Sequence, residues 1–158
     1  MNPRIQRTQP DDEYYFKEGC HILELSNAPD DPEVSIAQAR VAPGVTTRRH
    51  RLDGITERYV ILQGRGRVRL DGQAVQTVKP GDVILISPRC PQHITNVGTA
   101  DLVFLAICAP RFIPDAYEEI DGFALSLERL RELASPFSGS VIFPSGRIFT
   151  CRFASGCS

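Results

Sequence analysis

The sequence lacks a strong net charge and a long apolar run. Its 18 basic and 19 acidic residues leave a formal charge of -1, so we expect neither nucleic acid nor a membrane as partner. No apolar stretch approaches the roughly 20 residues that a helix needs to cross a bilayer. The polar start, residues 1–12, has no apolar segment of the kind found in signal peptides. These absences predict a cytoplasmic protein.

The cysteines lack the spacing of a metal site or of a disulfide framework. Five are present, an odd number, and no two of them form a CxxC pair. Zinc fingers need such pairs, and stable disulfides need an oxidising compartment. We therefore expect reduced thiols and no zinc finger. Lysine is also scarce, at two of the 18 basic residues, which we interpret as the composition of a GC-rich genome rather than a functional signal.

What the sequence does contain is a series of short strand patterns. Apolar or alternating segments occur at 14–25, 34–41, 57–63, 67–70, 74–78, 83–86 and 101–108, with glycine and proline between them. Asp71-Gly72 is the strongest hairpin-turn signal. This spacing predicts an all-β fold, an antiparallel barrel or sandwich. Near the end we expect one helix over 126–134, capped by Ser126, and a hairpin over 140–153.

One motif has a distinctive spacing. From Gly44, five residues lead to His50, one more to Leu52, four to Glu57 and six to Gly64. This run resembles the first motif of the cupin superfamily, in which glycines bracket two histidines and a glutamate that hold a divalent metal. Leu52 stands where the family has its second histidine. The resemblance implies a cupin jelly-roll barrel whose metal motif is degenerate.

The second cupin motif is also recognisable. After Gly81, its positions for proline, glycine, histidine and asparagine are filled by Ser87, Arg89, Gln92 and Asn96. This gap-free alignment places Gln92 at the position of a metal ligand, whereas a one-residue insertion would place His93 there. Side chains alternate between the two faces of a strand, so Gln92 and His93 cannot both point inward. We favour Gln92 inward, because Asn96 then keeps its family position.

The resemblance implies a divalent metal held by His50, Glu57 and Gln92, with His93 replacing Gln92 under the insertion alignment. Iron, nickel, zinc and manganese all suit such donors. Because a neutral amide is a weaker donor than imidazole, we expect weak binding. A second interpretation stays open, in which His50 and Glu57 form a buried hydrogen-bonded pair without any metal.

The functional prediction is a small cytoplasmic cupin that binds a small organic ligand inside the barrel. Glu57 and Tyr59 share an inward face and are the candidate catalytic residues. Arg48, Tyr59 and Asn96 are candidate ligand-binding residues, and Arg48 on the His50 face would favour an anionic substrate. The alternatives are a metal-dependent enzyme of the dioxygenase, isomerase or cyclase type, and a ligand-sensing module that is not an enzyme.

The predicted organisation has three parts. Residues 1–13 form a flexible arm, 14–114 the barrel, and 115–158 an extension of helix and hairpin. The extension is expected to pack on the barrel or on a partner subunit, because its apolar residues are too few for a core of their own. Cupins often pair through exposed strands, so we also expect a homodimer.

Overall fold

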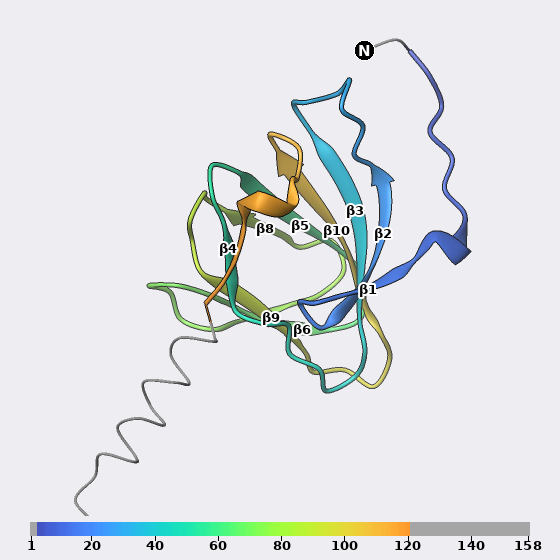
Figure 1. Cartoon of the computed structure of the whole chain (residues 1–158). Coiled ribbons are helices and arrows are strands. Elements are labelled where there is room, and N and C mark those ends of the chain that lie inside the picture. Colours follow the sequence, from blue (N-terminus) through green and yellow to red (C-terminus); the bar gives the residue numbers. More distant parts are fainter. Residues whose placement is uncertain (1–2, 121–158) are drawn as a thin grey trace, which may run out of the picture. The chain divides into compact units, whose positions relative to one another are not determined.

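A computed structural model describes residues 3–120 of the chain, which form two antiparallel β-sheets packed face to face (Figure 1). The six-stranded sheet has the order β1 (Tyr14–Phe16), β2 (Cys20–Ser26), β3 (Ser35–Val41), β10 (Leu102–Ala109), β5 (Thr56–Gln63), β8 (Val83–Ile86). The five-stranded sheet has the order β11 (Tyr117–Glu119), β4 (His50–Leu52), β9 (Gln92–Asn96), β6 (Gly66–Leu70), β7 (Gln76–Val78). Two short 3-10 turns, η1 (Pro10–Asp12) and η2 (Pro114–Ala116), complete the described elements. The predicted all-β antiparallel fold is confirmed.

The core lies between the sheets and follows from alternation along the strands. In β5 the inward positions are Glu57, Tyr59 and Ile61, all buried, while their neighbours are more exposed. The same alternation in β10 buries Leu102 and Phe104. Tyr59 and Phe104 pack ring against ring, with centroids 4.4 Å apart. The apolar interior therefore surrounds a few inward polar side chains, which the next subsection describes.

Gly64, the last residue of the first motif, lies where its backbone comes close to that of residues 101 and 102. Its φ of 86° lies in the left-handed region. A Cβ at this position would lie 2.7 Å from the carbonyl oxygen of Asp101 and 2.9 Å from Cα of Leu102. The glycine therefore lets the β5–β6 turn lie directly against the start of β10.

The structure differs from the prediction at both ends of the barrel. Residues 14–25 form two strands rather than one, because the chain turns between Phe16 and Cys20 at Gly19, which has a φ of 96°. The strand β11 was not predicted; it lies beyond the expected barrel end at residue 114 and pairs with β4. The predicted helix over 126–134 and hairpin over 140–153 lie outside the described residues.

Residues 3–9, before η1, have no regular structure, although Arg4 forms an ion pair with Asp30. The flexibility predicted for residues 1–13 stays a prediction. No helix in the described part of the chain is long and apolar enough to span a membrane.

Candidate functional site

Four buried polar side chains meet inside the barrel. His50 begins β4, Gln92 begins β9 directly opposite it, and Glu57 and Tyr59 come from the inward face of β5. The side-chain nitrogen of Gln92 lies 2.9 Å from Nε2 of His50, 2.8 Å from Oε2 of Glu57 and 2.7 Å from the hydroxyl of Tyr59. Antiparallel pairing of short strands thus brings together residues up to 42 positions apart.

The contacts of His50 fix its tautomer. Its Nδ1 lies 2.9 Å from the carbonyl oxygen of Arg48, which can only accept, so Nδ1 carries the proton. In the neutral ring Nε2 is then an acceptor, and the Gln92 amide donates to it. The same amide donates to the Glu57 carboxyl. The carbonyl oxygen of Gln92 is buried and has no hydrogen-bond partner among the described residues.

Glu57 lies in an environment that opposes its ionisation. Burial is the main cause that raises the pKa of Glu57 to about 7; His50, Tyr59 and Cys108 oppose the increase and the Glu18 carboxyl adds to it. The thiol of Cys108 lies 3.9 Å from Oε1 of Glu57. Burial also raises the pKa of Tyr59 well above its usual value, so the phenol stays protonated. The Glu57 carboxyl and the Tyr59 hydroxyl therefore lose their protons at a higher pH than such groups do in water.

A cavity of about 550 Å³, including its open mouth, is lined in part by His50, Leu52 and Cys108. Its walls come from β1, β2, β3 and β10 on one side and from β4 and β11 on the other. Most of its lining atoms are apolar. Aromatic rings from Tyr14, Phe16, Phe112 and Tyr117 surround it.

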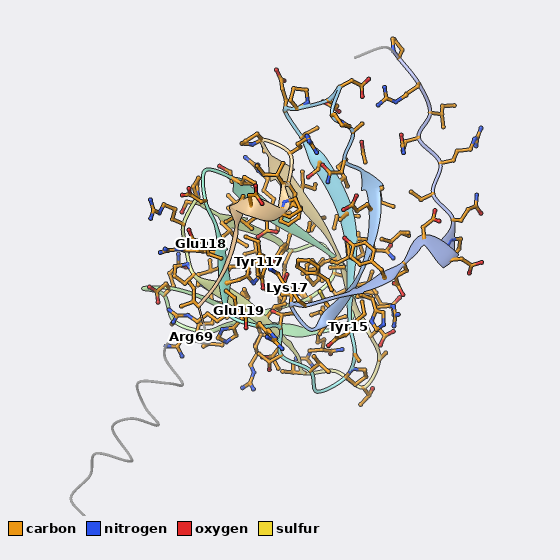
Figure 2. All side chains as sticks on the ribbon, viewed as in Figure 1. Tyr15, Lys17, Arg69, Tyr117, Glu118 and Glu119 are labelled. Carbon is orange, nitrogen blue, oxygen red and sulfur yellow. The ribbon has the colours of Figure 1, made fainter. Side chains whose placement is uncertain are left out.

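Two polar residues of this cavity carry no motif signal and were missed by the sequence interpretation. Glu18 lies in the turn after β1, and its Oε1 is 3.5 Å from Nδ1 of His50. Burial raises the pKa of Glu18 to about 8. Tyr117 of β11 stacks on the His50 ring, with centroids 4.9 Å apart and planes at 21°. Figure 2 shows Tyr117 beside Lys17, whose ammonium lies 4.3 Å from its ring centroid.

A family model for the cupin domain matches residues 37–108, a span that includes His50, Glu57 and Gln92. The chain therefore contains a cupin domain. An uncharacterized protein of Methanocaldococcus jannaschii is 37% identical over 101 residues, which cover 63% of this cupin and 80% of the relative. The oxalate-binding protein of Thermotoga maritima is 35% identical over 71 residues, 45% of this cupin and 58% of that protein.

Solved structures agree on the fold. A cupin 2 conserved barrel domain protein from Salinispora arenicola superposes with a TM-score of 0.59 at 20% identity, covering 79% of this cupin and 99% of that chain. At this identity the likeness shows the shared jelly-roll barrel and carries no further conclusion.

The orientation of the second motif agrees with the gap-free alignment. Gln92, Ile94 and Asn96 are buried in the cupin barrel, whereas His93 and Thr95 lie on the other face of β9. The insertion alignment, which would turn His93 inward, is therefore wrong. Asn96 has a structural role: its amide donates to the carbonyls of Val41 and Ala100, and its oxygen accepts from the backbone of Gly98.

Arg48 does not point inward as the strand alternation predicted. The regular strand begins only at His50, so the alternation does not extend back to Thr46 and Arg48, which are both exposed. The guanidinium of Arg48 instead forms an ion pair of 2.7 Å with Glu119. None of the three predicted ligand-binding residues, Arg48, Tyr59 and Asn96, is among the residues that line the cavity.

The donor set fits a resident divalent metal poorly. At the point where His50, Glu57 and Tyr59 converge, Gln92 offers only a neutral amide, which is a weaker metal ligand than imidazole. Leu52, at the second histidine position, is buried and offers only carbon. Within residues 3–120, no three His, Cys, Asp or Glu side chains converge as a metal site would require.

Proposed function

We propose that this cupin binds a small organic molecule in the cavity between β1, β2 and β3 and the strands β4 and β11. The observation that carries the proposal is an apolar cavity whose wall includes Tyr117, a buried residue with an unpartnered hydroxyl. Tyr117 is 8% exposed, its hydroxyl has no hydrogen-bond partner among the described residues, and it lines the cavity with His50 and Glu18. Buried polar groups in native structures are almost always satisfied, so a ligand or water is expected there.

The shape and lining of the cavity support this function. Small-molecule sites are concave and mostly apolar, with a few polar groups that orient the ligand. Here His50 and Glu18 supply such groups beside aromatic walls. The name of the Thermotoga maritima relative, an oxalate-binding protein, supports binding of a small organic molecule as a role for this family.

The test is a thermal-shift screen of small metabolites, followed by calorimetry on a cavity-filling variant. Ala37 and Ala106 lie opposite each other on β3 and β10 and both line the cavity. Ala106→Phe places a ring in this space, so we expect hits to lose at least about tenfold in affinity, roughly 1.4 kcal/mol.

The matched control is Ala100→Phe, at an exposed position that does not line the cavity. It should retain the affinity of the unaltered protein. Ala106→Leu serves as a milder filling variant if the phenylalanine lowers the melting temperature. The proposal is refuted if no compound in the screen binds. It is also refuted if the filled variant and the control variant bind a compound with equal affinity.

Metal-dependent catalysis is not part of this proposal, because the donor set fits a metal poorly. The weakly bound iron, nickel, zinc or manganese ion stays a prediction, as do the catalytic roles of Glu57 and Tyr59. The ligand-sensing alternative and the homodimer also remain predictions.

A further inference from the structure

The charged residues of the cavity are acidic. Glu18 and Glu24 line it together with His50, and none of the described lining residues is arginine or lysine. Arg48 and Lys17 are not among the residues that line the cavity. Arg48 pairs with Glu119, and Lys17 is exposed, with its ammonium over the Tyr117 ring. A ligand in the cavity therefore meets carboxyl groups and no basic side chain other than histidine.

Glu18 has an incomplete set of partners for a buried carboxyl. Its side chain is 11% exposed, and Nδ1 of His50 lies 3.5 Å from its Oε1. That nitrogen already donates a hydrogen bond of 2.9 Å to the carbonyl oxygen of Arg48. Burying a carboxyl group without a strong hydrogen-bond donor costs free energy. A cationic ligand would supply both a donor and an opposite charge to Glu18.

The aromatic walls suit the same kind of ligand. Phe16 packs edge to face against both Phe112 and Tyr117, with centroids 6.4 Å and 5.4 Å apart. Ring faces attract ammonium groups most strongly where water is excluded. Lys17 over Tyr117 shows that one ring of this group already contacts a cation.

We infer that the cavity selects an organic cation, an amine with an apolar body whose ammonium group lies against Glu18. This inference rests on the proposed function and names the class of its ligand. It departs from the anionic substrate predicted from Arg48, since that guanidinium is outside the cavity. A small anion such as oxalate would meet the carboxyl groups of Glu18 and Glu24 with no basic side chain but His50 to offset them.

The experiment uses a matched set of probes on the full chain. Calorimetry compares 2-phenylethylamine, 2-phenylethanol, 3-phenylpropionate and oxalate at about pH 8.5, where a small alkylamine is still protonated. We expect the amine to bind at least about tenfold tighter than the alcohol, and the two anions to bind more weakly than the alcohol.

Glu18→Gln tests the assigned contact, because it keeps the shape and removes the charge. It should weaken the amine at least about tenfold and change the alcohol less than about twofold. Glu33→Gln, at an exposed position off the cavity, should change neither. If Glu18→Gln unfolds, the ranking of probes on the unaltered protein still decides.

Two outcomes separate the inference from the proposed function. Tighter binding of an anion than of the amine, or an unchanged amine affinity in folded Glu18→Gln, overturns the cation assignment and leaves ligand binding intact. The same holds if none of the four probes binds and the hits of the metabolite screen are anions or neutral molecules. If neither the probes nor the screen yields any ligand, the proposed function itself fails.

Discussion

Gln92 and Leu52 change the centre of this barrel in different ways. The amide of Gln92 donates hydrogen bonds to His50 and Glu57, so these two groups are satisfied by the protein itself. Leu52 stands where the family has a metal-ligating histidine, and its apolar side chain lines the cavity instead. Gln92 thus places an amide at a metal-ligand position of the family, and Leu52 adds an apolar side chain to the cavity wall.

We expect metal binding to be weak and to be restored by two substitutions. After dialysis against a chelator, the unaltered protein should contain far less than one iron, nickel, zinc or manganese ion per chain. The double variant Leu52→His, Gln92→His presents three imidazoles and a carboxyl and should retain about one ion, measured by elemental mass spectrometry.

His93 provides the control for this prediction. Adding His93→Ala to the double variant should not change its metal content, because that side chain lies on the other face of β9. Full occupancy of the unaltered protein after EDTA would contradict the interpretation of Gln92 as a replacement for the metal.

At the scale of elements, the sequence predicted which side chains point into the barrel wherever a regular strand determines this. In β5 and β9 the alternation placed Glu57, Tyr59 and Gln92 inward correctly, because burial alternates regularly over residues 56–61 of β5 and throughout β9. It failed for Arg48, which precedes β4 and follows no strand geometry. Glu18 and Tyr117 were missed because a turn and a three-residue edge strand leave no periodic pattern, and only tertiary packing brings them to His50.

The turn between β5 and β6 should tolerate no side chain at Gly64. Gly64→Ala would place a methyl group within 2.9 Å of the backbone of residues 101 and 102, in addition to its left-handed φ. We expect a loss of at least about 2 kcal/mol in the free energy of unfolding, measured by urea denaturation.

Gly72→Ala is the matched comparison for this substitution. Gly72 also has a positive φ, 73°, but a Cβ there meets nothing within 4 Å. It should cost only about 1 kcal/mol, the strain of the left-handed conformation alone. Equal losses in the two variants would show that the close approach to β10 contributes nothing.

At the scale of the whole molecule, two buried carboxyls link stability to pH. The folded-state pKa values of Glu57 and Glu18, about 7 and about 8, exceed the ordinary value of 4.5. Between about pH 4.5 and pH 8 the folded protein binds more protons than the unfolded chain, so its free energy of unfolding falls as pH rises. Below about 4.5 the contribution is complete, and above about 8 it is lost.

The free energy of unfolding should therefore decrease between about pH 5 and pH 8, by up to about 1.4 kcal/mol per pH unit for each carboxyl. Urea denaturation across this range measures the slope. Glu18→Gln should make the slope shallower, whereas Glu33→Gln, on the surface, should leave it unchanged. A stability that is independent of pH in the unaltered protein would contradict the burial of both groups as acids.

The strand β1 gives the cavity a wall that is held on one side only. It is three residues long, lies at the edge of its sheet and pairs with β2 alone, yet Tyr14 and Phe16 line the cavity. Short edge strands open locally at far lower free energy than the unfolding of the whole domain. The residence time of a bound molecule would then follow the fraying of this strand, and hydrogen exchange at its amides would report the same opening that releases the ligand.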